Sequence, residues 1–187
     1  MERSIRSADA DFLSRELRSE IKHEYLAGAA HAKADTSNRH NAIAGNIITT
    51  LHTQLRGNAF KPWNSDTKVR LRLRNGTRFY YPDAMVVCRP NPESWSYQDD
   101  PSVIVEVISD STRRTDEGEK RDAYLTIPGL SACLMAEQNS PTVFVMRRTT
   151  AGFVRENYVG PDAEISLPDI DATLALSELY EGIEFDS

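Results

Sequence analysis

The chain has 187 residues, 40% of them hydrophobic, and a formal net charge of -6. This length suits one domain with a proper core, and the acidic balance argues against a protein that coats nucleic acid by bulk attraction. No apolar run reaches the roughly 20 residues that span a bilayer, the N-terminus lacks the apolar stretch of a signal peptide, and Cys88 and Cys133 both lie in apolar runs. We therefore expect a single domain over residues 1–187 in a reducing cytoplasm.

The first elements expected along the chain are a helix and a small hairpin. Ser7 is a candidate helix cap, and Phe12, Leu13 and Leu17 would form the apolar stripe of that helix. Gly28 lies between two short extended pieces and predicts the turn of a hairpin.

A second helix is predicted between Ser37, a candidate cap, and Gly57, which comes just after the expected end. Its apolar residues recur at four-residue steps and would form one buried face: Ile43, Ile47, Leu51 and Leu55.

The middle of the chain predicts strands and a crossing helix. Residues 68–74 alternate between charged and apolar side chains, and Asn75-Gly76 indicates a tight turn into a second strand. Residues 102–108 are nearly all apolar and β-branched, which is typical of a central strand covered on both faces. A helix opened by Asp116 would then pack across the sheet and end before Pro128.

The last third of the chain predicts more strands and a short terminal helix over residues 174–182. The expected strands are residues 132–138, 142–148, 152–160 and 163–167. The whole order predicts an α/β (mixed α+β) fold: a mixed β-sheet flanked by helices, with an N-terminal helix and hairpin and additional C-terminal strands.

Two acids stand inside segments that otherwise resemble buried strands. Asp83 heads one apolar run and Glu106 lies in the middle of another, and burying a carboxylate without a partner costs several kcal/mol. If the two strands are neighbours, the acids converge on one spot and supply the oxygen ligands that Mg²⁺ and Mn²⁺ prefer. The alternative is structural: Asp83 caps a turn after Pro82, and Glu106 pairs with an arginine or lysine.

The motif Pro82-Asp83, followed by Glu106-Val107-Ile108, resembles the split acidic motif of the PD-(D/E)XK nuclease superfamily. Within it, the chain is most similar to the Uma-type restriction endonuclease family. The similar segments follow the family's order over nearly the whole chain: "KHEYLAG", "SNRHNAIAGNI", "NSDTKVRLR", "FYYPDAMVV", "PSVIVEVISDST", "DEGEKRDAYLTIPGL" and "LALSELYEGI".

The resemblance implies a restriction-endonuclease-like core and Mg²⁺-dependent DNA cleavage, with Mn²⁺ as a substitute. It makes Asp83 and Glu106 the metal ligands, with a backbone carbonyl beside Glu106 as a further oxygen donor. Glu24, in "KHEYLAG", matches the family position of an additional acid near the metal. His40 matches a position that contacts phosphate or the outer shell of the metal, although a lone histidine is more often a capping or packing residue.

The chain departs from the superfamily pattern where a lysine normally stands two residues after the second acid, because Ile108 occupies that position. Another cation must then stabilise the transition state. Lys120 is the first candidate, since the family carries a lysine on the following helix and Asp116, Lys120 and Tyr124 share one helical face. Lys68 is the alternative.

Two further departures lie near the motif. Ala29 stands where many relatives have a glutamate, and Asp110 stands where a proline is usual. The first removes an acid from the surroundings of the site, while Asp110 either caps the next turn or adds negative charge.

A basic face is expected on the first strand of the central hairpin. Lys68, Arg70, Arg72 and Arg74 alternate with apolar residues, and they either contact phosphates or form an ordinary solvated face. Arg147 and Arg148 would extend this face.

The leading hypothesis is thus a metal-dependent endonuclease with DNA as its substrate. The second is a catalytically weakened module of the same fold, used for nucleic-acid binding or homo-oligomer assembly, and an RNase on the same scaffold is a third. No nucleophile elbow or phosphate-binding glycine loop supports another hydrolase class. A homodimer built through strand edges or the apolar end of the chain, residues 174–185, would suit cleavage of both strands of a duplex.

Overall fold

The computed structural model describes residues 7–33, 36–110 and 113–185, apart from the side chain of Ser7. The first helix, α1, spans Ser7–Glu16, so it already includes Ser7, and the expected cap cannot be assessed because that side chain lies outside the described part. Phe12 packs on Tyr25 with 4.7 Å between the ring centroids. The prediction for Leu17 was wrong: it lies beyond the helix and is 71% exposed.

The expected hairpin is confirmed and consists of β1 (His23–Leu26) and β2 (Ala29–Ala32). Gly28 has a φ of 115°, a value that residues with a side chain rarely adopt, which explains the glycine at this turn. All four residues of β2 are exposed.

The second helix, α2, spans Asn38–Gln54, as its pattern predicted. Its N-cap is Ser37, whose hydroxyl accepts the backbone N–H of His40 at 3.1 Å. Ile43, Ile47 and Leu51 are fully buried on one face. This cap fixes the first turn of α2. His40 belongs to that turn and lies beside the predicted acid Asp83.

One sheet has five strands in the order β2-β1-β5-β4-β7. It contains the predicted central hairpin, β4 (Lys68–Leu73) and β5 (Gly76–Tyr80), joined by a two-residue loop. The short strand β7 (Tyr97–Gln98) runs parallel to β4 and was not predicted.

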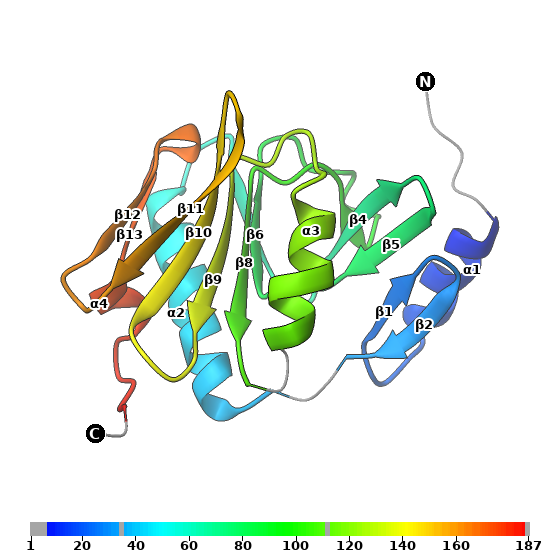
Figure 1. The fold of residues 1–187 in the computed structure, drawn as a ribbon. Helices are drawn as coiled ribbons and strands as arrows, with labels where there is room; N and C mark the ends of the chain where they lie inside the picture. Colours follow the sequence, from blue (N-terminus) through cyan, green and yellow to red (C-terminus); the bar gives the residue numbers. More distant parts are fainter. Residues whose placement is uncertain (1–6, 34–35, 111–112, 186–187) are drawn as a thin grey trace.

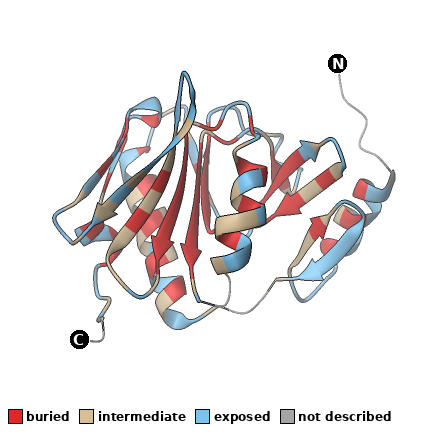
Figure 2. Ribbon diagram, in the orientation of Figure 1, coloured by how far each residue is buried: buried red, intermediate tan, exposed pale blue. Residues whose placement is uncertain are grey.

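The second sheet has six strands in the order β11-β10-β9-β8-β6-β3. Its strands are β3 (Lys61–Asn64), β6 (Ala84–Val87), β8 (Val103–Ile108), β9 (Ala132–Glu137), β10 (Thr142–Thr149) and β11 (Gly152–Val159). Every residue of β8 and β9 is buried, which confirms the central strand (Figure 2). The strands were expected to form one mixed sheet, and they divide into this sheet, the five-stranded sheet and a separate pair.

Helices cover both faces of the six-stranded sheet, with α2 behind it and the helix of residues 113–124 in front (Figure 1). The front helix is already α-helical at residues 113–114, becomes π-helical in η1 (Thr115–Lys120), and continues as α3 (Arg121–Tyr124). Asp116 does not open it, because Arg114 already has helical dihedral angles and Asp116 is buried inside the first turn. The predicted cap at Asp116 was therefore wrong.

The C-terminal part adds a two-stranded sheet, β12 (Glu164–Leu167) and β13 (Ala172–Ala175), linked by the 3-10 turn η2 (Pro168–Ile170). The terminal helix α4 spans only Leu176–Leu179, because β13 takes the start of the segment predicted as helix. Leu176, Leu179 and Tyr180 pack in the same core cluster as the apolar face of α2. The apolar end of the chain is thus largely used inside the molecule, which removes one of the two surfaces expected to form a dimer.

Over the described ranges, no helix is both long and apolar enough to span a bilayer.

Candidate active site

The two predicted acids meet at the junction of the two large sheets. Asp83 directly precedes β6, after the chain leaves the five-stranded sheet, and Glu106 lies within β8. Ala84 pairs with Val105 in the antiparallel register, and continuing this register by one residue places Asp83 opposite Glu106. Residues opposite each other in antiparallel strands present their side chains on the same face. The fold therefore brings together two carboxylates that are 23 positions apart in the sequence.

Asp83 is 5% exposed and accepts contacts from three directions. Its Oδ2 accepts the backbone N–H of Val107 at 2.8 Å and lies 3.1 Å from Nε2 of His40, and Lys33 Nζ is 3.4 Å from Oδ1. Burial by itself would raise the pKa of Asp83, but the contact with His40, the charge of Lys33 and the backbone donor together lower it to about 2. Asp83 is thus held as an anion.

Glu106 is 2% exposed, and its pKa shifts in the opposite direction to that of Asp83. The Tyr124 hydroxyl donates to Oε1 at 2.6 Å, and Lys120 Nζ is 4.0 Å from the same oxygen. Burial, together with the negative charges of Asp83 and Asp116, outweighs the attraction of Lys120 and raises the pKa of Glu106 to about 8. Tyr124, predicted on the same helical face as Lys120, therefore contacts the central acid directly.

Lys120 stands among carboxylates, as its place on the helical face predicted. Its ammonium lies 2.8 Å from Glu24 Oε1, 3.4 Å from Asp116 Oδ1 and 4.0 Å from Glu106 Oε1. Burial would lower the pKa of Lys120, but the three acids raise it above its usual value. Glu24 reaches this point from β1, so the N-terminal hairpin contributes a side chain to the cluster.

The side chains here have the chemistry that a divalent cation requires. Four acids (Glu24, Asp83, Glu106 and Asp116) lie near two lysines, Lys33 and Lys120. Burial, and then the charges of Asp83 and Asp116, raise the pKa of Glu106. The residues fit a cation in this respect. Within the parts of the chain that the structure describes, however, no three His, Cys, Asp or Glu side chains are grouped as a metal site. Glu24 would have to leave Lys120 to become a third ligand.

Lys68, the alternative cation, belongs to another cluster. It is 3% exposed, and its ammonium lies 3.2 Å from the Tyr81 hydroxyl and 4.9 Å from the centre of the Tyr81 ring. The Tyr81 hydroxyl in turn donates to Glu16 at 2.8 Å. Burial lowers the pKa of Lys68, and Glu16 only partly offsets this effect.

The predicted basic face is not a continuous surface. Arg70 is buried, donates two bonds to Asp99 at 2.8 and 2.6 Å and stacks 4.4 Å from the Tyr97 ring, whereas Arg72 is exposed. Arg147 pairs with Glu156 at 2.9 Å, and Arg148 donates to the carbonyl oxygens of Leu130 and Ile127. These last two arginines lie on β10 of the other sheet, so they do not extend the hairpin face.

The structure shows the environment of each residue that departs from the family pattern: Ile108, Ala29 and Asp110. Ile108 is fully buried in the apolar cluster that contains Tyr124, so a lysine in its place would lie in an apolar environment. Ala29 is exposed at the hairpin turn. Asp110 is also exposed, at 82%, and its carboxylate is 3.8 Å from Arg113, so it adds no charge to the buried acids.

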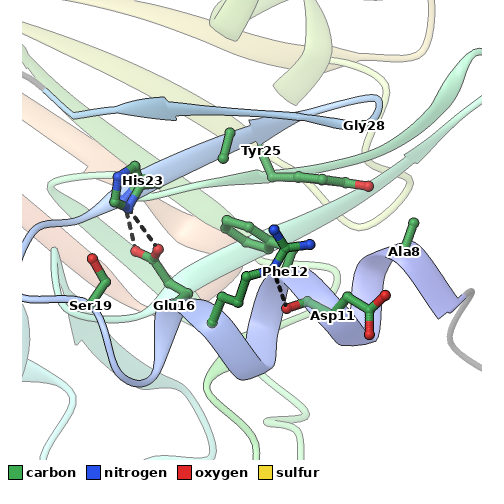
Figure 3. Close-up of a pocket in the computed structure, with 10 residues that line it drawn as sticks. Ala8, Asp11, Phe12, Glu16, Ser19, His23, Tyr25 and Gly28 are labelled. Atoms are coloured by element: carbon green, nitrogen blue, oxygen red, sulfur yellow. Dashed lines mark hydrogen bonds and ion pairs between the residues drawn. The ribbon is translucent and has the colours of Figure 1, made fainter.

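Two hollows lie near these groups. A cleft of about 600 Å³ is open to Asp83 and is also lined by Lys22, Lys33, His40 and Asn41. A second pocket, of about 390 Å³, lies between α1 and the N-terminal hairpin, where Glu16 contacts His23, and contains neither predicted metal ligand (Figure 3). Of these two, only the first is lined by a predicted metal ligand, Asp83. Lys33 was not found from the sequence, because a single lysine after a hairpin has no distinguishing pattern.

Comparison with known proteins places this chain in a family. A curated Synechocystis protein, "Uncharacterized protein slr1290", is 29% identical over 177 residues, covering 94% of this chain and 92% of its own. A second, "Uncharacterized protein sll1609", is 30% identical over 132 residues, covering 69% and 73%.

The fold matches a crystal structure described as "a putative nuclease belonging to DUF820" from Anabaena variabilis, with a TM-score of 0.71 and 19% identity over 90% of this chain and 96% of that one. The family model Uma2, described as "Putative restriction endonuclease", matches residues 9–177. The chain therefore belongs to the Uma2 restriction endonuclease family.

Proposed function

We propose that the protein is a Mg²⁺-dependent endonuclease that hydrolyses phosphodiester bonds of DNA, with residues 1–187 acting as a single domain. The observation that carries this proposal is the pair of buried carboxylates, Asp83 just before β6 and Glu106 in the neighbouring strand β8, beside a buried lysine. A purely structural pair of acids would have little reason to be kept so close without enough positive charge to balance it.

Asp83 and Glu106 would hold the ion, and Glu24 would join them after releasing Lys120. Restriction endonuclease-like families generally use divalent metals, and such an ion polarises the phosphodiester and lowers the pKa of a bound water. The chain supplies the rest. Lys120 places positive charge where the phosphorane becomes negative, Tyr124 fixes the orientation of Glu106 through its 2.6 Å hydrogen bond, and His40 does the same for Asp83.

The test is cleavage by the purified wild type of supercoiled plasmid DNA and, separately, of single-stranded RNA, each with Mg²⁺, with Mn²⁺ and with EDTA. We expect metal-dependent nicking of the plasmid and none with EDTA. If only the RNA is cleaved, the substrate is RNA and the proposal of DNA as the substrate is wrong. Absence of cleavage of both, with Mn²⁺ binding also absent in calorimetry, would contradict the proposal.

A second function is favoured by one observation: Lys120 is already paired with three acids, and Glu24 is engaged by it. A nuclease fold in this state would act as a nucleic-acid-binding module. It would bind duplex DNA without cleaving it, and adding Mn²⁺ would not change the affinity. The same calorimetric titration with and without DNA separates the two functions.

The identity of the catalytic cation gives a sharper prediction. Lys120→Met should lower the single-turnover cleavage rate by roughly 10²–10³, as for removal of one charge-stabilising group. Lys68→Met should change it by less than about tenfold, because Lys68 contacts Tyr81 instead of the acids. The measurement is single-turnover cleavage well below the melting temperature of each variant. A larger loss in Lys68→Met would reverse the assignment.

We also propose a homodimer, since cutting both strands of a duplex is achieved simply by two sites related by two-fold symmetry. The exposed edge strand β2 is available for such a contact.

A further inference from the structure

The cleft beside Asp83 contains charged groups that the proposed reaction has not yet used. Its lining includes two lysines, Lys22 and Lys33, from the two ends of the N-terminal hairpin. Opposite them is the first turn of α2, with His40 and Asn41, and Asp83 lies where the cleft meets the acids. A ligand in this cleft would therefore meet positive charge and polar donors directly beside the predicted metal ligands.

Lys33 is fixed in this position by its surroundings. Its backbone N–H donates to the carbonyl of Lys22 at 2.8 Å, which closes the open end of the hairpin. Its ammonium donates to the carbonyl oxygen of Tyr81 at 2.9 Å and has a longer contact, 3.4 Å, with Asp83. An ammonium has three N–H donors, and across the described chain these two are the partners found. One donor is left to bind a ligand.

Among Lys22, Lys33 and Lys120, Lys33 has the longest nearest contact to a carboxylate. Lys120 has three carboxylates within 4.0 Å. Lys22 pairs with Asp66 at 2.6 Å. Lys33 has a single carboxylate, at 3.4 Å, and that carboxylate is Asp83 itself. A cation bound to Asp83 would compete for this contact and leave the Lys33 ammonium facing the cleft.

His40 provides a second polar group at the same place. The residue is 5% exposed and lines the cleft, and its Nε2 is committed to Asp83 at 3.1 Å. Its Nδ1 is buried and has no hydrogen-bond partner among the residues that the structure describes. Buried polar atoms normally have partners, so His40 adds an unsatisfied polar group to the lining of the cleft.

We propose that this cleft is the binding site for the sugar-phosphate backbone of the substrate and that Lys33 binds a phosphate in it; the inference rests on the proposed nuclease function. Lys33 and Lys120 then have different acids as neighbours. Lys120 neutralises charge beside Glu106, while Lys33 holds the phosphate beside Asp83. A lysine that contacts phosphate as a point charge contributes affinity without base specificity.

The experiment measures binding of a short fluorescent DNA duplex in Ca²⁺, by anisotropy, over a series of salt concentrations. It compares wild type with Lys33→Gln, with Lys33→Arg, which keeps the charge, and with Lys61→Gln. Lys61 is a matched control because it is exposed and lies opposite Val87, at the end of β6 away from Asp83. Both glutamine variants change the net charge equally. Cleavage by the wild type in Mg²⁺ is measured in parallel.

We expect Lys33→Gln to weaken binding on the order of tenfold at low salt. The slope of log K against log[salt] should become shallower by about 1, the change expected when one phosphate contact is lost. Lys33→Arg should keep the wild-type slope, and Lys61→Gln should leave it unchanged. If Lys33→Gln behaves like Lys61→Gln while the wild type binds and cleaves, the inference fails and the proposed function stands. A wild type that neither binds nor cleaves overturns both.

Discussion

Glu106→Gln is expected to abolish cleavage and, in metal-free buffer near pH 9, to make the protein more stable. The loss of activity should be roughly a thousandfold or more, because the substitution removes one of the two central acids. The gain in stability follows from burial, which together with nearby Asp83 and Asp116 raises the pKa of Glu106 to about 8. At pH 9 the wild type must keep a carboxylate charged where a neutral group is preferred, and glutamine avoids that cost.

The pH dependence has a definite sign. A carboxyl whose pKa is raised in the folded state contributes its full stability below the unfolded pKa, 4.5, and loses it as the pH rises through about 8. A shift of this size corresponds to on the order of 5 kcal/mol. The variant should therefore melt several degrees above wild type at pH 9 and within about a degree or two of it at pH 5.

Adding Mn²⁺ should reverse the order at pH 9, because only the wild type gains stability from binding the ion. The measurement is thermal unfolding at both pH values, in EDTA and in Mn²⁺. Glu164→Gln, at an exposed position of β12, is the control for the loss of one charge. A Glu106→Gln variant that is less stable than wild type in EDTA at pH 9 would mean that the charge is well compensated and would remove the electrostatic argument for a cation.

Asp83→Asn should abolish cleavage to a similar extent, but its effect on stability should be the opposite. Asp83 accepts the Val107 N–H and contacts His40 and Lys33. Asparagine keeps one acceptor oxygen and loses the negative charge beside Lys33 and the contact of that charge with His40. We expect a loss on the order of 2 kcal/mol near pH 7, the value that corresponds to a carboxyl pKa lowered from 3.8 to about 2.

That stability is present above the unfolded pKa of 3.8 and is lost as the pH falls through about 2. The difference between Asp83→Asn and wild type should therefore shrink from pH 7 to pH 3 in denaturant titrations. Asp110→Asn is the control, because Asp110 is largely exposed. Calorimetry should also show that Asp83→Asn no longer binds Mn²⁺. Unchanged Mn²⁺ affinity would leave Asp83 with a structural role alone.

Patterns within one element predicted that element well. The four-residue steps of α2 and the apolar run of β8 describe how a single helix or strand is buried, and both are confirmed. The pairing of distant strands has no such local signal. The sequence therefore did not reveal that β4 and β5 belong to one sheet and β6 and β8 to another, nor did it predict β3 or β7.

The candidate site shows the same division. Asp83 and Glu106 were conspicuous as acids in apolar runs, but the resemblance to the nuclease superfamily is what made them predicted metal ligands. Lys120 was predicted from the lysine that the family carries on this helix, together with the four-residue spacing to Asp116 and Tyr124. The contacts of Arg70 with Asp99 and of Lys68 with Tyr81 depend on tertiary packing, so the expected basic face could not be tested from its alternation alone. Asp116 resembled a helix cap because Arg113 and Arg114, which are already helical, are not residue types that mark the start of a helix.

The N-terminal hairpin contributes Glu24 from its first strand and Lys33 from just after its second. These side chains contact Lys120 and Asp83, which lie far along the chain. A partly folded molecule could thus assemble the six-stranded sheet, with both central acids in place, before the hairpin docks. Such a molecule would lack the Lys33 contact to Asp83 and the Glu24 contact to Lys120. The arrangement ties completion of the candidate site to the docking of the hairpin, so that a newly made chain would acquire the full set of charged groups only at that step of folding.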